Sequence, residues 1–107
     1  MKPVIDDLSS DPTLSSSAAL AQALTIRADA RLEAAPQDVN GALEDIRRAT
    51  EMDSSIGRTW RVRSDAEEAA GNIQGAMEAV SRWAEAEPSF ATKAKKELTR
   101  LSSKLAP

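Results

Sequence analysis

The sequence predicts an all-α protein of about five helices, and three observations lead to that prediction. Only 3% of the 107 residues are aromatic while alanine is abundant, a composition that favours closely packed helices over a sheet. Apolar residues recur at three- and four-residue intervals, which is the period of a helix with one buried face. No stretch of four or more residues alternates as a strand does. The length suits one domain with a single modest core.

The chain begins with a segment that has little apolar periodicity. Residues 1–14 contain two prolines, two serines and three aspartates, so we expect a flexible leader there. The first helix should begin near residues 15–17, where a serine can cap it, and end before Pro36. Its buried face is predicted to consist of Leu20, Leu24, Ala28 and Leu32.

Three further helices follow at short intervals. Asp38 or Asn40 can start the second helix, and residues 53–55 break it. Its apolar stripe is Val39, Ala42, Leu43, Ile46 and Ala49. The third helix is expected over about residues 57–70, where Gly71 and Asn72 supply a C-terminal stop. The fourth should cover about residues 73–86.

A last helix is predicted after Pro88. Ser89 can cap it, and its apolar stripe would consist of Phe90, Ala94, Leu98, Leu101 and Leu105. This stripe gives the helix one face that must be buried against the preceding helices.

The sequence repeats itself when it is shifted by 34 positions. The shift aligns Ile26 with Trp60, Val39 with Ile73, Gly41 with Gly75, Ala42 with Ala76, Glu44 with Glu78, and Ile56 with Phe90. A 34-residue helix-turn-helix period is that of tetratricopeptide repeats, and the chain resembles that family. The resemblance implies antiparallel helix pairs stacked as a short right-handed α-solenoid. Within a domain of residues 15–107, it places repeat 1 at about 20–54, repeat 2 at about 55–88 and a capping helix at 89–106.

The second copy carries most of the family pattern, but both copies depart from it at the same places. The matching residues are Trp60, Gly71, Ala76, Val80 and Pro88. Arg63 and Glu67 stand where the family has leucine and tyrosine, and Asp29 and Glu33 occupy the same places in the first copy. We expect either that neighbouring helices pair these charges, for example Asp29 with Arg63, or that the repeats differ in geometry.

The expected contacts between repeats differ in size. Stacking should bring Ala49 against Ser64 at the internal junction, and Trp83 against Leu98 at the last one. Large residues on both sides of the last junction predict a terminal capping helix that Trp83 holds further out.

Neither histidine nor cysteine occurs in the sequence, so the commonest general base, nucleophile and metal ligands are missing. We therefore predict a protein that is not an enzyme and that uses no cofactor or metal. No apolar run approaches the roughly 18 residues of a membrane span, and the start lacks the hydrophobic stretch of a secretory signal. A soluble, cytoplasmic protein is the expectation.

The resemblance also implies a binding surface, because first helices of stacked tetratricopeptide repeats line a concave groove that holds peptides or partner helices. The charged positions that it places in this groove are Arg27, Arg31, Arg58, Arg61, Asp65, Glu68 and Lys95. Arginine suits bidentate capture of carboxylates, which predicts an acidic protein or peptide partner. Trp83 is expected in the core or, if partly exposed, as a partner anchor. The competing interpretation is that these charges are merely solvated helix neighbours.

Two other roles stay open. The chain would be a structural subunit if its divergent face and open N-terminal end pack permanently inside a larger complex or a homo-oligomer. Residues 90–107 carry 5 Lys/Arg and 1 Asp/Glu, so the last helix is also compatible with an anionic membrane surface. A capping role explains the same apolar stripe better. Nucleic acid is not an expected partner, because residues 1–89 carry 9 Lys/Arg against 16 Asp/Glu and aromatic residues are scarce.

Overall fold

The computed structural model describes residues 16–105, and this part of the chain is all-α. It contains five α-helices, one 3-10 turn and no strand. The elements are α2 (Ser17–Glu33), α3 (Val39–Met52), α4 (Gly57–Ala69), α5 (Ile73–Ala86), η2 (Pro88–Phe90) and α6 (Ala91–Ser103). The prediction of an all-α fold is confirmed, while the expected leader at residues 1–14 lies outside the described residues.

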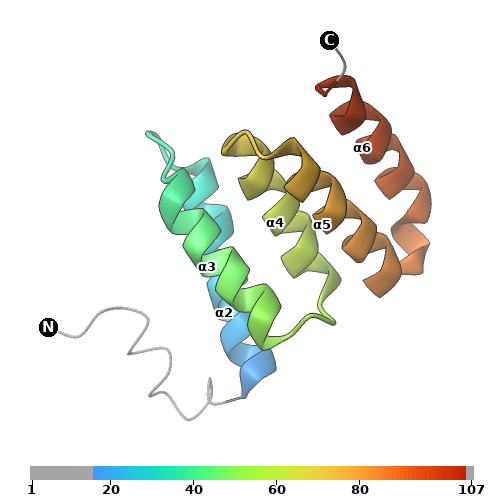
Figure 1. Ribbon diagram of the computed structural model, residues 1–107. Coiled ribbons are helices and arrows are strands. Elements are labelled where there is room, and N and C mark those ends of the chain that lie inside the picture. The colour runs from blue at the N-terminus through green and yellow to red at the C-terminus, as the bar shows by residue number, and fades with distance from the viewer. Residues whose placement is uncertain (1–15, 106–107) are drawn as a thin grey trace, which may run out of the picture.

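The helices pair as antiparallel hairpins (Figure 1). Helix α2 packs along α3, and α4 packs along α5. The first hairpin meets the second where α4 packs against α2 and α3, and α6 packs against α5 at the other end. The described chain is therefore a row of two hairpins closed by a single helix.

Helix starts repeat at the predicted spacing. Asp38 accepts a hydrogen bond from the Gly41 amide at 2.9 Å, and Asn72 accepts one from the Gly75 amide at 3.1 Å. These two N-caps are 34 residues apart, as are the amides that they bind. Ser16 caps α2 through the Ala19 amide at 3.1 Å. Side-chain caps thus fix the beginning of three of the five helices.

The turn between α4 and α5 requires glycine. Gly71 has a φ of 85°, a backbone conformation that side-chain-bearing residues rarely adopt. Its amide donates to the Glu68 carbonyl at 2.9 Å, which satisfies one of the last carbonyls of α4. The predicted stop at this position is confirmed.

Apolar side chains form two clusters. The first lies between α2, α3 and α4, and contains the predicted stripe of Leu20, Leu24, Ala28 and Leu32 together with Ala42, Ile46, Ala49, Val62 and Ala66. The second joins α5 to α6 and contains Ala76, Val80, Trp83, Ala94 and Leu101. Burial of these faces supplies the main driving force for stacking the hairpins.

The start of the last helix differs from the prediction. Ser89 is not an N-cap, because it lies inside η2; α6 begins only at Ala91 and follows Phe90 without a side-chain cap. Pro88 favours this extra turn, since its fixed φ suits the first position of a helical segment. Leu105 was expected on the buried stripe, but it lies beyond the end of α6 and is 49% exposed.

The junction between α2 and α4 is closed by a polar contact. The Thr25 and Thr59 hydroxyl oxygens are 2.8 Å apart, and both residues are buried. Thr25 donates to the Ala21 carbonyl at 2.7 Å, which leaves the Thr59 hydroxyl to donate to Thr25. Thr25 and Thr59 are also 34 residues apart, so equivalent positions of successive repeats touch.

Neighbouring helices pair three of the four charged departures from the family pattern, Asp29, Arg63 and Glu67, although the expected pair of Asp29 with Arg63 was wrong; Glu33 is exposed and forms no ion pair among the described residues. Arg63 does not bind Asp29; it bonds to Glu67 at 3.3 Å and to the Thr50 hydroxyl at 2.7 Å. Glu67 is only 2% exposed and also accepts from Arg47 at 2.8 Å. Burial alone would raise the pKa of Glu67, but hydrogen bonds and the charge of Arg47 outweigh that effect and lower it. Asp29 pairs instead with Arg58 at 3.7 Å.

The candidate binding cleft between helices α4 and α6

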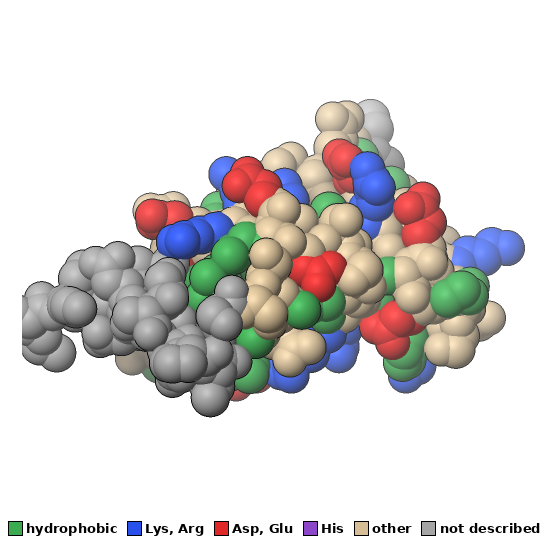
Figure 2. Space-filling view, turned by 90° about the horizontal axis from the view of Figure 1, so that it is seen from below, with side chains coloured by type: hydrophobic (Ala, Val, Ile, Leu, Met, Phe, Trp, Pro, Cys, Tyr) green, Lys and Arg blue, Asp and Glu red, His purple; other side chains and the backbone are tan. Residues whose placement is uncertain are grey.

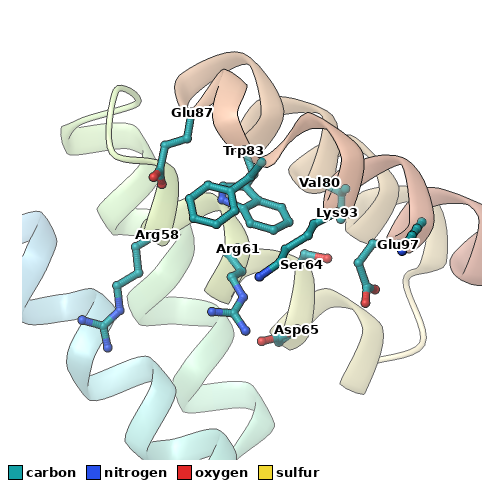
Figure 3. Close-up of a pocket in the computed structure, with 11 residues that line it drawn as sticks. Arg58, Arg61, Ser64, Asp65, Val80, Trp83, Glu87, Lys93 and Glu97 are labelled. Carbon is teal, nitrogen blue, oxygen red and sulfur yellow. The ribbon is translucent and has the colours of Figure 1, made fainter.

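A cleft of about 490 Å³ opens between α4 and α6 above the surface of α5. Figure 3 shows Lys93 extending from α6 toward Arg61 and Ser64 on α4, with Trp83 between the two helices. The cleft is lined by Arg58, Arg61, Ser64, Asp65, Val80, Trp83, Glu87, Phe90, Lys93, Lys96 and Glu97.

The cleft exists because α6 stands away from α4. The backbones of α2 and α4 are in contact, whereas those of α4 and α6 are not. At the position of α6 that corresponds to Thr59, the chain has Lys93, which lines the cleft. At the position of α5 that corresponds to Ala49, it has Trp83, whose side chain fills the space beside α6. The predicted outward displacement of the last helix agrees with this geometry.

Two stacked rings form the floor. The Trp83 and Phe90 ring centroids lie 5.2 Å apart, with 27° between the ring planes. Trp83 is 6% exposed, so it is a packed residue of the second apolar cluster and not the partly exposed anchor that was considered. The Arg61 guanidinium lies 6.0 Å from the Trp83 ring centroid, and the Lys93 ammonium lies 5.6 Å from that of Phe90. The floor is thus apolar and is bordered by cations.

The cations of the cleft are largely unneutralised. Within residues 16–105, neither Arg61 nor Lys93 nor Lys96 forms an ion pair with a carboxylate. Arg58 has one long pair, with Asp29 at 3.7 Å, and is exposed. The predicted site residues Arg58 and Arg61 are therefore brought together with two lysines from α6.

The carboxylates of the cleft are fewer and differently placed. Glu97 binds Arg100 at 2.7 Å, and the Glu87 side chain crowds the start of α4 beside Gly57. Burial raises the pKa of Asp65, which Arg61 opposes and Glu68 reinforces. Arg61 and Asp65 are one helical turn apart on α4, but they form no ion pair with each other. Both residues line the cleft, and their interpretation as solvated helix neighbours stays a competing prediction.

A cluster of charges ties α4 to α6 beyond the cleft. Arg100 donates to both carboxylate oxygens of Glu68, at 2.7 and 2.8 Å, and Lys104 donates to one of them. Hydrogen bonds from Arg100 and then Lys104 lower the pKa of Glu68 from 4.5 to about 2. Glu68, Arg100 and Lys104 thus hold α6 at a fixed position relative to α4 although the two backbones do not touch.

Arg27 and Arg31 are not part of this cleft. Arg27 donates to both oxygens of Asp45, at 2.7 and 2.6 Å, and Arg31 lies 3.7 Å from the same carboxylate. Asp45 is only 3% exposed, so Arg27 holds α2 to α3 through a nearly buried ion pair. The structure places both arginines inside the first hairpin and not beside Arg58 and Arg61.

Lys95 also lies outside the cleft, and Lys93 and Lys96 take its place. Residues of a helix turn by about 100° each, so Lys95 falls on one flank of the buried stripe formed by Ala94 and Leu101, and Lys93 and Lys96 fall on the other. The 34-residue alignment could not show on which side of the stripe each lysine lies. A helical-wheel projection of α6 centred on its buried stripe would have shown it.

The rest of the surface has mixed charge. In the view from below, acidic and basic side chains of the described residues are interspersed and no broad area of one sign covers this face (Figure 2). Within residues 16–105 no three carboxylates gather as metal ligands would, and none of the helices there has the length and apolar content to cross a membrane.

No family model matches this chain, and no curated protein or solved structure similar to it was found.

Proposed function

We propose that the chain is a tetratricopeptide-like interaction module that binds an acidic peptide or partner helix in the cleft between α4 and α6. One observation supports this proposal above all others. Arg61, Lys93 and Lys96 form no ion pair among the described residues, and they surround a floor of two stacked rings. Such a site favours ligands that place carboxylates beside an apolar side chain.

The repeated architecture supports the family assignment within this proposal. N-caps recur at Asp38 and Asn72, and the hydroxyls of Thr25 and Thr59 touch across one 34-residue period. The proposed role is binding and not catalysis, since the sequence has neither histidine nor cysteine. A cytoplasmic adaptor or assembly factor is the setting that we propose for it.

The test is a binding titration with a fluorescein-labelled peptide of sequence Leu-Glu-Asp-Leu-Glu-Asp. We expect the double variant Arg61→Glu/Lys96→Glu to bind this probe at least tenfold more weakly than the wild type, a change of about 1.4 kcal/mol. Binding to the wild type should also weaken with added salt, because the contacts are charged. Circular dichroism establishes that the variants keep their helix content.

Lys95→Glu is the matched control, because it reverses a charge one position away on the same helix but outside the cleft. It should bind the probe within about twofold of the wild type, since only screened long-range attraction changes. Equal losses in both variants would show a nonspecific effect of net charge and would refute a binding site in the cleft.

A second candidate function is a structural subunit, and one surface favours it. Ile26 is 57% exposed on α2, on the open side of the first hairpin; one helical turn further along, Ala30 is exposed as well, and Ala23 one turn before is half-buried. An obligate subunit would self-associate through such a face or unfold at low temperature when isolated. Sedimentation of the wild type against Ile26→Glu tests this role, because a monomeric wild type of ordinary thermal stability rules it out.

A further inference from the structure

We propose that the chain's own acidic leader, residues 1–14, occupies the cleft between α4 and α6 of the same molecule. This inference rests on the proposed function, because it names a resident occupant for the same site. Its support is the fit between the composition of the leader and the cleft, together with the length of chain that joins them.

The leader has the chemistry that the cleft selects. It carries one lysine and three aspartates, so its side chains sum to −2, and the aspartates are Asp6, Asp7 and Asp11. Two of these carboxylates are adjacent and stand between apolar neighbours, in the stretch Val4, Ile5, Asp6, Asp7 and Leu8. Paired carboxylates flanked by aliphatic side chains match cations placed around an aromatic floor.

The connecting chain is long enough to reach. Thr25 lies nine residues beyond Ser16, which is roughly 14 Å along α2, and its hydroxyl touches Thr59 of α4. Crossing α4 from there to the cleft adds about 10 to 15 Å. Asp6 and Asp7 precede Ser16 by nine or ten residues, which span about 30 Å when extended. When extended, this stretch is therefore long enough for the two carboxylates to reach the Arg61 side chain without any change in the helices.

An occupant tethered in this way regulates the site. A leader that is tethered beside the cleft competes with any outside ligand for the same site, so an acidic ligand must displace it before binding. The apparent association constant for an outside ligand is then its intrinsic value multiplied by the fraction of molecules whose cleft is free of the leader. The leader acts as an internal competitor that selects against weak acidic ligands.

The absence of cysteine from the sequence makes a clean test possible. A nitroxide label on Ser9→Cys, in the full chain, should broaden the amide signals of the cleft-lining residues on α4 and α6 and leave those of the α3 surface sharp. Adding Asp7→Lys should restore the cleft signals. Asp11 lies too close to Ser16 to reach the cleft, so adding Asp11→Lys instead should leave the cleft signals broadened.

A mixing experiment separates docking within one molecule from docking on a second copy. Chains that carry the nitroxide but no ¹⁵N are mixed with ¹⁵N-enriched chains that carry no nitroxide. Broadening in the mixture would show that the leader binds a second copy, and this result would overturn docking within one molecule. If a ¹⁵N-enriched chain that itself carries the nitroxide shows no broadening of its cleft signals, docking is overturned altogether.

The same probe peptide separates failure of this inference from failure of the proposed function. With the leader in the cleft, Asp6→Lys/Asp7→Lys should bind the Leu-Glu-Asp-Leu-Glu-Asp probe at least fivefold more tightly than the wild type. Equal binding by both proteins would overturn the inference and leave the proposed function standing. No binding by either, together with unbroadened cleft signals, would overturn both.

Discussion

The junction between α2 and α4 is closed, whereas the one between α4 and α6 is open, although both join first helices of successive repeats. The closed junction has a threonine on each side, Thr25 and Thr59, whose hydroxyls touch. The open one pairs the same Thr59 position with Lys93. Ala49 lies behind the first junction and Trp83 lies at the equivalent place behind the second. The packed junction and the cleft therefore differ at two equivalent positions: threonine is replaced by Lys93, and alanine by Trp83.

The cations around the two junctions also differ in their pairing. Near the closed junction, Arg27 of α2 is bound to Asp45 of α3 and Arg47 of α3 to Glu67 of α4, and both carboxylates are nearly buried. On the open side, Arg61 and the lysines of α6 that line the cleft have no carboxylate partner among the described residues. The ion pairs that join helices are thus formed within the fold, whereas three cations at the open junction keep no carboxylate partner and line one cleft. Arg48 and Lys95 also form no ion pair among the described residues but lie outside this cleft, so the candidate site is marked by unpaired cations together with the cleft, and not by sequence position in the repeat.

The largest effect on this comparison should come from Trp83→Ala. The indole is 6% exposed and holds α6 to α5 through Phe90 and Leu98, so its loss leaves a cavity at the open junction. We expect the free energy of unfolding to fall by about 3 to 5 kcal/mol. Urea denaturation followed by circular dichroism measures this change. A loss below about 1 kcal/mol would show that the ring does not set the position of α6.

Most of the fold could be predicted from the sequence, because the signals for helices are local. The start of α3 at Asp38, the turn at Gly71 and the buried stripe from Leu20 to Leu32 all depend on residues within one or two helical turns. The exception was the start of α6, where Ser89 has the right chemistry for a cap but Phe90 must reach Trp83. Pro88, which favours the short 3-10 turn, is a local signal for that boundary, and the packing of Phe90 on Trp83 is not.

The site was predicted less well, because it depends on partners distant in the chain. Arg58 and Arg61, which the resemblance assigns to a groove, line the cleft, whereas Arg27 and Arg31, assigned to the same groove, lie beside Asp45 and outside it. A free arginine and a paired one look alike in sequence when the partner lies 18 residues away on another helix. Only the three-dimensional structure shows which charged side chains have no partner of opposite charge among the described residues.

A smaller effect is expected from the charges that tie α6 to α4. Glu68→Gln should lower the free energy of unfolding by about 1 to 2 kcal/mol at pH 7, less than the pKa shift alone suggests because Arg100 and Lys104 stay nearly half exposed. The pKa of Glu68 is about 2 in the folded chain, below the ordinary 4.5. Its contribution is therefore complete above pH 4.5 and is lost as the pH falls toward 2.

Urea titrations of wild type and Glu68→Gln from pH 7 to pH 2.5 check this sign. The difference in stability between the two proteins should stay constant down to about pH 4.5 and then shrink. A difference that does not change over this range would mean that the carboxylate is not held by Arg100 and Lys104 in solution. The result bears on the open junction, because these contacts are the direct side-chain link between its two helices.

The smallest effect concerns the closed junction, where Thr25 and Thr59 share one hydrogen bond. Thr59→Val keeps the shape of the side chain and removes the hydroxyl that donates to Thr25, so we expect a loss of about 1 kcal/mol. Thr25→Val should cost slightly more, since it leaves the Thr59 hydroxyl buried without its acceptor. In the double variant neither hydroxyl remains, and its loss should fall short of the sum of the single losses by about 0.5 to 1 kcal/mol. Additive losses would show that the two helices are held by the surrounding apolar packing alone, and the contrast with the Lys93 junction would then rest on side-chain size and not on this polar contact.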